Sequence, residues 1–149
     1  MNEDASREST DAATGRSEFT TIVGVGAGGA AGAAARWLIV EAVGDTPADE
    51  GGFPWGTLLV NVLGCLLVGF AARRLRHAER AHAVVVTGVL GGFTTMSAVA
   101  VELNALAEES RIGVAAIYLT VTLGAGFAAV LVGSITAGDP RWTSDEDRS

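Results

Sequence analysis

The sequence predicts an all-α integral membrane protein with four transmembrane helices. Hydrophobic residues make up 49% of the 149 residues and gather in four long apolar stretches. Each stretch comes close to the roughly 20 residues that an α-helix needs to cross a bilayer. The stretches scarcely alternate between apolar and polar residues, as the helices of a soluble domain would. Because these segments take up nearly all the hydrophobic residues, none remain for a separate soluble core.

The composition excludes several classes of protein. The net charge is −7, and the ten cationic side chains, all Arg, provide no basic surface for nucleic acid. The single cysteine, Cys65, allows neither a disulfide framework nor a cysteine metal site. The sequence contains no Ser-His-Asp arrangement, HExxH motif or nucleotide-binding loop. We therefore expect neither an enzyme nor a nucleic-acid-binding protein.

Polar segments flank the apolar region at both ends. The first is rich in Ser, Thr, Asp and Glu, a composition typical of disordered chain, and it lacks the pattern of a secretory signal. We expect a disordered acidic tail at 1–19, a transmembrane domain at 20–137 and a polar acidic tail at 138–149. Within that domain the four helices are expected at about 20–43, 54–72, 83–107 and 112–136.

The first two helices carry small and polar residues at helical spacing. Gly24, Gly28 and Gly32 form a face that lets another backbone approach closely. Arg36 is either a side chain that snorkels to the membrane surface or an arginine in an aqueous vestibule that attracts anions. On the second helix, Asn61 is costly in an apolar setting unless it is paired. It predicts either an interhelical hydrogen bond or a pore-lining donor.

The third helix is interrupted in its middle. Gly91 and Gly92 are followed by two threonines, and Gly costs about 1 kcal/mol relative to Ala inside a helix. Freed backbone groups are tolerated in a membrane only within protein or beside water, and such broken helices often bind ions. We expect a break at Gly91–Thr95 that forms an ion site, although close packing through small residues is the alternative.

The fourth helix has a polar or small stripe formed by Tyr118, Thr122 and Gly126. A coupled cation transporter usually needs a carboxylate in the middle of the membrane. In this chain Glu41 lies at a helix end and Glu102 lies beyond the predicted break. Hydroxyl, amide and small residues form the polar faces instead, which favours a passive path for a small ion.

The arginines predict how the chain is oriented. The dense basic cluster follows the second helix and consists of Arg73, Arg74, Arg76 and Arg80. The 44–53 loop contains no Arg, and the third loop contains only Arg111. Because short loops rich in Arg stay in the cytoplasm, we expect the 73–82 loop and both termini to be cytoplasmic, in a multi-pass protein of the cell membrane.

Three motifs resemble the CrcB/Fluc family of fluoride channels. They are Gly28-Gly-Ala-Ala-Gly-Ala-Ala-Ala-Arg36-Trp37, Gly56-Thr-Leu-Leu-Val-Asn61-Val-Leu-Gly64 and Gly88-Val-Leu-Gly91-Gly-Phe-Thr94-Thr-Met-Ser97. The resemblance covers about residues 20–136. It implies an antiparallel dimer of four-helix subunits that lets fluoride leave the cytoplasm passively. It also implies a structural sodium ion at the dimer interface, held by the backbone carbonyls of Gly91 and Thr94.

The resemblance also implies which side chains line the pore. By position, the polar ones are Asn61, Ser97, Glu102, Tyr118 and Thr122, and Arg36 is the vestibule arginine. The family usually has two phenylalanines on the third helix whose ring edges face fluoride. Here these positions are Met96 and Val99, and Phe93 is out of register by three residues.

This departure leaves several assemblies open. In the first, the chain is half of a heterodimer, and a paralogous partner supplies the phenylalanines. In the second, the chain forms a homodimer with altered conduction. The basic second loop favours the heterodimer, because an antiparallel homodimer must insert in both orientations. The alternatives are a non-conducting stabilising subunit and a small multidrug-type transporter. The transporter would need a carboxylate in the middle of the first helix, where the sequence has none.

Overall fold

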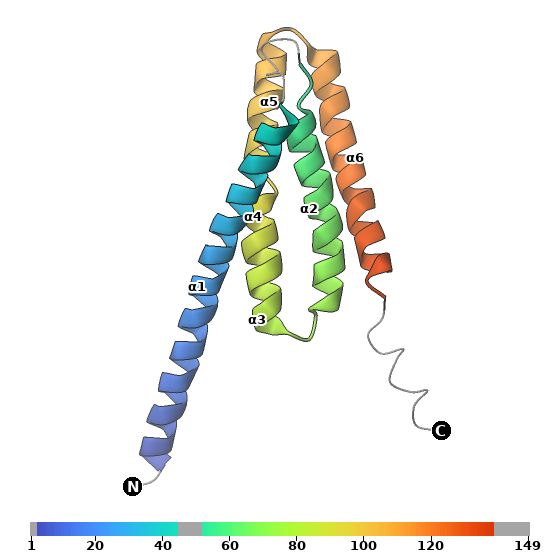
Figure 1. The fold of residues 1–149 in the computed structure, drawn as a ribbon. Coiled ribbons are helices and arrows are strands. Elements are labelled where there is room, and N and C mark those ends of the chain that lie inside the picture. The colour runs from blue at the N-terminus through green and yellow to red at the C-terminus, as the bar shows by residue number, and fades with distance from the viewer. Residues whose placement is uncertain (1–2, 45–51, 139–149) are drawn as a thin grey trace, which may run out of the picture.

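The computed structural model describes residues 3–44 and 52–138, with side chains from Gly15 onward. These residues form helices joined by short connections (Figure 1). The helices are α1 (Glu3–Val43), α2 (Trp55–Arg74), α3 (Glu79–His82), the π-helix η2 (Ala83–Leu90), α4 (Gly91–Phe93), α5 (Met96–Glu108) and α6 (Ile112–Thr136). The predicted tail beyond residue 138 and most of the 44–53 loop lie outside the described residues.

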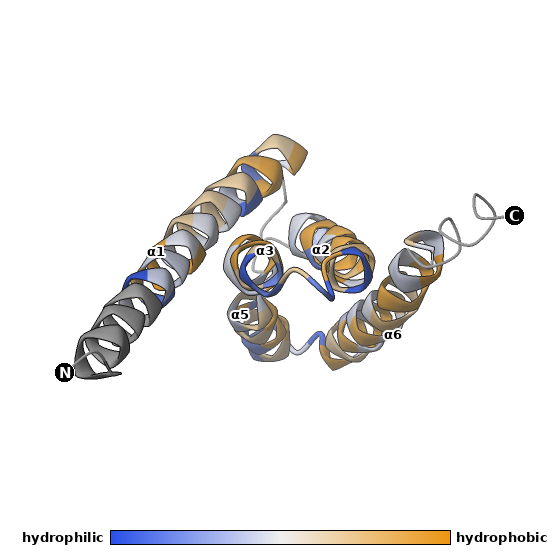
Figure 2. Ribbon diagram, turned by 90° about the horizontal axis from the view of Figure 1, so that it is seen from below, coloured by the Kyte–Doolittle hydropathy of each residue, from blue (hydrophilic) through white to orange (hydrophobic). Residues whose placement is uncertain are grey.

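Four helical segments are long and apolar enough to cross a membrane. They are Gly15–Val43, Trp55–Arg74, Glu79–Glu108 and Ile112–Thr136. Figure 2 shows hydrophobic residues along most of α2 and α6. Large apolar side chains such as Val101, Phe127 and Ile135 are exposed, as expected for a surface that contacts lipid rather than water. The chain is therefore an all-α, multi-pass membrane protein.

The first helix is longer than the sequence predicts. A disordered tail was expected up to residue 19, but α1 begins at Glu3 and continues to Val43. Once a helix has formed, each added residue gains one backbone hydrogen bond, so a helix extends more easily than it begins. The acidic N-terminal segment therefore continues the membrane helix in the structure, and the predicted boundary near residue 20 falls inside α1.

The third membrane segment is built from four consecutive elements. The chain passes through α3, η2 and α4, adopts an extended conformation at Thr94 and Thr95, and continues as α5. α1 packs against η2 and α4, whereas α5 packs against α6 and α2 runs along α6. In Figure 1, α1 begins and α6 ends at the same end of the bundle as the turn between α2 and α3.

Glycines bring α1 close to the third segment. A Cβ atom added to Gly32 would lie 2.0 Å from the carbonyl oxygen of Val89, and one added to Gly28 would lie 2.9 Å from that of Val84. Gly24 faces the Val84 side chain instead. Such separations are possible only without a side chain, so these glycines set the distance between the two helices.

A small core lies away from the contact between α1 and the third segment, where α5 meets α2 and α6. Leu58, Val99, Leu106 and Tyr118 form its buried cluster. The Tyr118 ring meets Phe53 edge to face, with ring centroids 5.5 Å apart. The core thus anchors the second half of the third segment, beyond Thr94 and Thr95.

Candidate functional site

The two threonines between α4 and α5 have extended backbones. Thr94 has φ −79° and ψ 155°, and Thr95 has φ −150° and ψ 122°. The predicted break began at Gly91, but Gly91–Phe93 form the helical turn α4. The non-helical stretch is therefore shorter than predicted. Glycine weakens a helix without ending it, so the contacts of Thr95 with Asn61 and Ala98 account for where the helix stops.

Asn61 holds Thr95 in this extended conformation. The Asn61 Nδ2 donates to the Thr95 carbonyl oxygen at 2.9 Å, and the Thr95 backbone N–H donates to Asn61 Oδ1 at 2.8 Å. Both residues are buried. Asn61 therefore makes the interhelical contact that the sequence analysis considered beside a pore role. The Nδ2 group has a second hydrogen, so the contact with Thr95 leaves one donor for another acceptor.

The same contacts release two backbone carbonyls. In a continuous helix the Thr95 N–H would donate to Gly91 O, and the Ala98 N–H would donate to Thr94 O. Here the Thr95 N–H donates to Asn61, and the Ala98 N–H donates to Thr95 Oγ1 at 3.2 Å. Gly91 O and Thr94 O thereby lose their helical donors. They are the two carbonyls to which the sequence analysis assigned sodium.

A cavity of about 370 Å³ opens beside Thr94 and Thr95. Its lining residues come from α2, the extended stretch, α5 and α6, and they are Asn61, Cys65, Val68, Thr94, Thr95, Met96, Thr122, Leu123, Gly126, Phe127 and Val130. Thr122 Oγ1 is buried and has no hydrogen-bond partner among the described residues. A buried hydroxyl without a partner costs about 1–3 kcal/mol, so this cavity favours a polar occupant next to Thr122.

Glu102 is hydrogen-bonded to two other helices. Thr57 donates to Glu102 Oε1 at 2.6 Å, and the Tyr118 hydroxyl donates to Oε2 at 2.5 Å. Thr57 and Tyr118 are both buried. The carboxyl group of α5 is thereby joined to α2 and α6. The sequence analysis placed Glu102 among the pore-lining residues, but it did not identify Thr57 as its partner.

Other predicted pore residues lie away from the cavity. Val99 is 1% exposed and Tyr118 is fully buried, both in the core cluster. Ser97 is exposed, and its hydroxyl contacts Thr95 Oγ1 at 3.0 Å. Arg36 is half-buried on α1, outside the cavity. Asn61, Met96 and Thr122 are thus the predicted pore residues that the fold brings together at one cavity.

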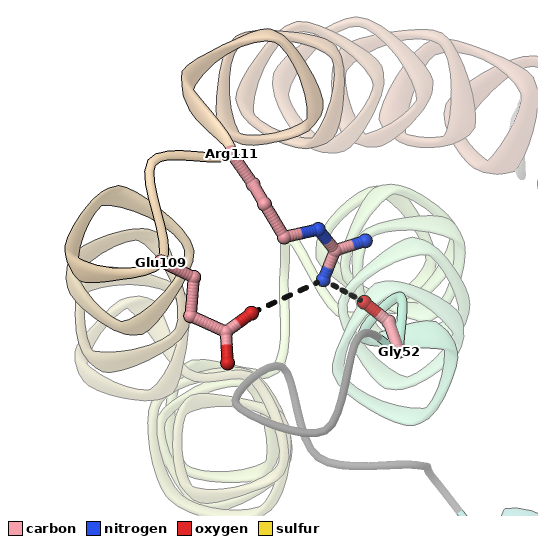
Figure 3. A network of polar contacts seen from close by, with 3 residues as sticks. All are labelled: Gly52, Glu109 and Arg111. Carbon is pink, nitrogen blue, oxygen red and sulfur yellow. Dashed lines mark hydrogen bonds and ion pairs between the residues drawn. The ribbon is translucent and has the colours of Figure 1, made fainter.

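Polar contacts connect the loops at each end of the bundle. At one end, Arg111 Nη1 donates to Gly52 O at 3.0 Å and lies 3.7 Å from the Glu109 carboxylate, as Figure 3 shows. At the other end, Arg73 and Arg74 donate to the carbonyls of Gly138 and Ala137 at the end of α6. A cationic side chain is stabilising at such a position, because the C-terminal end of a helix carries partial negative charge.

Comparison of the sequence with known proteins shows to which family the chain belongs. The family model described as CrcB-like protein, Camphor Resistance (CrcB), matches residues 23–134. The chain belongs to the CrcB family. A relative from Ruegeria sp. (strain TM1040) is 41% identical over 123 residues, covering 78% of this chain and 94% of its own. Another, from Prosthecochloris aestuarii, is 38% identical over 124 residues, covering 80% and 94%.

Both CrcB relatives are named fluoride-specific ion channel FluC. A third relative with this name, from Paracoccus denitrificans, is 41% identical over 121 residues and covers 79% of this chain and 94% of its own. The match to the family model includes the cavity residues and the extended stretch. The family was named correctly from the motifs in the sequence. The prediction that the chain is not an enzyme agrees with these names, which describe ion channels.

Proposed function

We propose that this chain is a fluoride channel subunit that lets fluoride leave the cytoplasm passively and so lowers its toxicity. The name shared by its relatives supports this proposal. The observation within the chain that carries it is the cavity next to Asn61, with the unpartnered hydroxyl of Thr122 inside it. A small anion needs hydrogen-bond donors to replace its water. Thr122 and the second Nδ2 hydrogen of Asn61 supply two of them.

A sodium ion at the centre of a dimer fits the released carbonyls. Gly91 O and Thr94 O lose their helical donors to Asn61 and Thr95, and carbonyl oxygens are ligands that hard cations prefer. Gly91 is exposed in the single chain, and a Cβ atom there would meet only Val86 O, at 3.8 Å. We propose that a second subunit covers this face and contributes the remaining ligands.

That second subunit is proposed to be a paralogue in the opposite orientation. Met96 is the residue of the α5 first turn that lines the cavity, and Val99 is buried in the core. Neither offers an aromatic edge to an anion. A partner with phenylalanines would complete the cavity of this chain. The pore that depended on Met96 and Val99 would instead conduct poorly. A subunit that only stabilises its partner is the remaining alternative.

Fluoride efflux from liposomes tests the proposal. Thr122→Val removes the hydroxyl but keeps the shape of the side chain, so it should slow efflux through the pair with its paralogue. The loss of one hydrogen bond to an ion, about 1.5–3 kcal/mol, corresponds to about 10–100-fold. Thr120→Val is the matched control, because Thr120 is exposed on the same helix and donates to Ala116 O. Equal rates for both variants, or robust efflux by this chain alone, would contradict the proposal.

Asn61→Ala should abolish efflux, whereas the corresponding change in the partner should have little effect. Each pore would take its polar groups from one subunit and its phenylalanine rings from the other. Because only the partner has these rings, the conducting pore is the one that uses the hydrogen-bond donors of this chain. Because Asn61 also holds Thr95, the folding of this variant must be checked by gel filtration. Equal loss of efflux from either variant would refute this division between the subunits.

The interface is tested by a pair of glycine variants. Gly91→Leu should prevent dimer formation, because its side chain would point toward the partner and the ion. Gly124→Leu is the control, since Gly124 is exposed on α6 and has nothing within 4 Å of an added Cβ. Cross-linking in membranes measures the dimer fraction. Equal dimer formation by both variants would exclude an interface at Gly91.

The orientation is tested by labelling the 73–82 loop. We propose that this loop and both termini are cytoplasmic, because the loop contains the arginine cluster. A cysteine introduced at Ala78 in a Cys65→Ser background should react with an impermeant reagent from the cytoplasmic side alone. Equal reaction from both sides would mean dual insertion, and the homodimer would then replace the heterodimer.

A further inference from the structure

Two sulfur-containing side chains line the cavity, and the proposed passage of fluoride uses neither. Cys65 is on α2, and Met96 is the first residue of α5. The chain has one cysteine and two methionines in all, so all its sulfur except that of Met1 is at this cavity. Fluoride is a hard anion and gains little from either group. The pair therefore suggests a second kind of ligand.

The thiol of Cys65 lies where α6 has no side chain. Gly126 lines the same cavity, and a Cβ atom added to it would be 3.3 Å from Cys65 Sγ. This distance is tighter than most real contacts, so a larger residue at position 126 would press on the sulfur. Met96 is 61% exposed, so its side chain can move. Cys65 is itself only partly buried and lines the cavity, so its thiol can be reached from there.

The unpartnered hydroxyl of Thr122, which the proposed passage of fluoride also uses, is a second sign that the cavity takes a polar or charged ligand. Its Oγ1 is buried, the residue is 5% exposed, and the hydroxyl has no partner among the residues that the structure describes. A hydroxyl oxygen has two lone pairs that can face a cation. The cavity thus combines a thiol, a thioether and an unpartnered oxygen.

We propose that this cavity is a binding site for a soft monovalent cation such as Ag⁺ or Cu⁺. Thiolate and thioether ligands select such ions, whereas hard cations prefer oxygen. Cys65 and Met96 are the two sulfur ligands, and Thr122 Oγ1 faces the ion. On binding, the S–H bond of Cys65 breaks, a sulfur–metal bond forms, and the proton passes to solvent. No electrons are transferred, and the ion fills part of the space beside Asn61.

Silver binding to the purified protein tests this site. Silver nitrate is added in chloride-free buffer with a soluble thiosulfate competitor, and the bound silver is measured after gel filtration. The wild-type chain should bind one Ag⁺. Mutating an outer-shell partner of a bound metal typically costs about 10–100-fold in affinity, so Met96→Leu, which removes a direct ligand, should weaken binding by at least about 10-fold. Because Met96 is exposed and Leu has a similar volume, this variant should fold normally.

A relocated thiol is the matched control. Cys65→Ser combined with Leu67→Cys keeps one cysteine on α2 but places it on an exposed position that does not line the cavity. This variant should compete for silver at least about tenfold less well than wild type, because the relocated thiol no longer lines the cavity together with Met96. Equal binding by the relocated thiol, or an unchanged affinity in Met96→Leu, would overturn the proposal. Neither measurement depends on fluoride transport.

Discussion

The two halves of the third membrane segment are held in different ways. Before Thr94, η2 and α4 pack against α1 through close contacts between glycines and backbone atoms, such as Gly32 against Val89 O and Gly92 against Gly29 O. After Thr95, α5 is held by side chains. Val99 lies in the core, and Glu102 accepts hydrogen bonds from α2 and α6.

The difference shows why the chain changes conformation between these halves. Backbone contacts fix the first half against one neighbour, and hydrogen bonds fix the second half against two others. Asn61 contacts Thr95 at the boundary between them. A continuous helix would have a single axis, and along that axis it would have to make both the contacts with α1 and the hydrogen bonds with α2 and α6. The extended threonines let each half follow its own neighbours.

The largest expected effect comes from the glycine contact. Gly32→Ala would place a Cβ atom 2.0 Å from Val89 O, so α1 must move away, at a cost of about 3 kcal/mol for such overpacking. Gly26→Ala is the control, because an added Cβ there has nothing within 4 Å. Thermal unfolding in detergent measures both. If the two variants unfold alike, backbone proximity does not hold the first half in place.

Asn61→Ala addresses the boundary between the halves. It removes both hydrogen bonds to Thr95 and leaves buried backbone groups without partners, which should cost about 1–3 kcal/mol. Asn104→Ala is the control, since Asn104 is exposed on α5 and its side chain donates to Glu108 on the same helix. A loss for Asn61→Ala no larger than for Asn104→Ala would show that Thr95 is held by something else.

Tyr118→Phe and Thr57→Val each remove one hydrogen bond to Glu102 from the second half. Interhelical hydrogen bonds in membrane proteins average about 0.6 kcal/mol and reach about 1.7. We expect each variant to lose stability within this range. The double variant should lose less or more than the sum, because both groups share one carboxyl. Strict additivity would mean that the two hydrogen bonds to Glu102 act independently of each other.

The smallest effect is expected at the loop that follows the second half. Arg111 is partly exposed, and its contacts with Gly52 O and Glu109 lie at the end of the bundle. Arg111→Ala should cost at most about 1 kcal/mol, as is usual for exposed ion pairs. Thermal unfolding at low and high salt measures it. A larger loss of stability would mean that this loop, and not the core alone, holds α5 and α6 together.

Much of this arrangement was predictable because it depends on local composition. The four membrane segments follow from the length of the apolar stretches, and the family follows from the motifs around Asn61 and Thr94. The start of α1 was not predicted, because a polar composition does not prevent a helix from extending once it has formed. The π-helix η2 was also missed, since nothing in its sequence distinguishes it from an apolar α-helix.

The sequence by itself determined which segments enter the membrane, which residue types are unusual there and which family the chain belongs to. These properties depend on transfer of side chains into lipid and on motif spacing, both of which are local. The tertiary structure decided the partners: Asn61 with Thr95, Glu102 with Thr57 and Tyr118, and Cys65 beside Gly126. Hydrogen bonds and close contacts between helices depend on how the helices are rotated and packed, and no single segment contains that information.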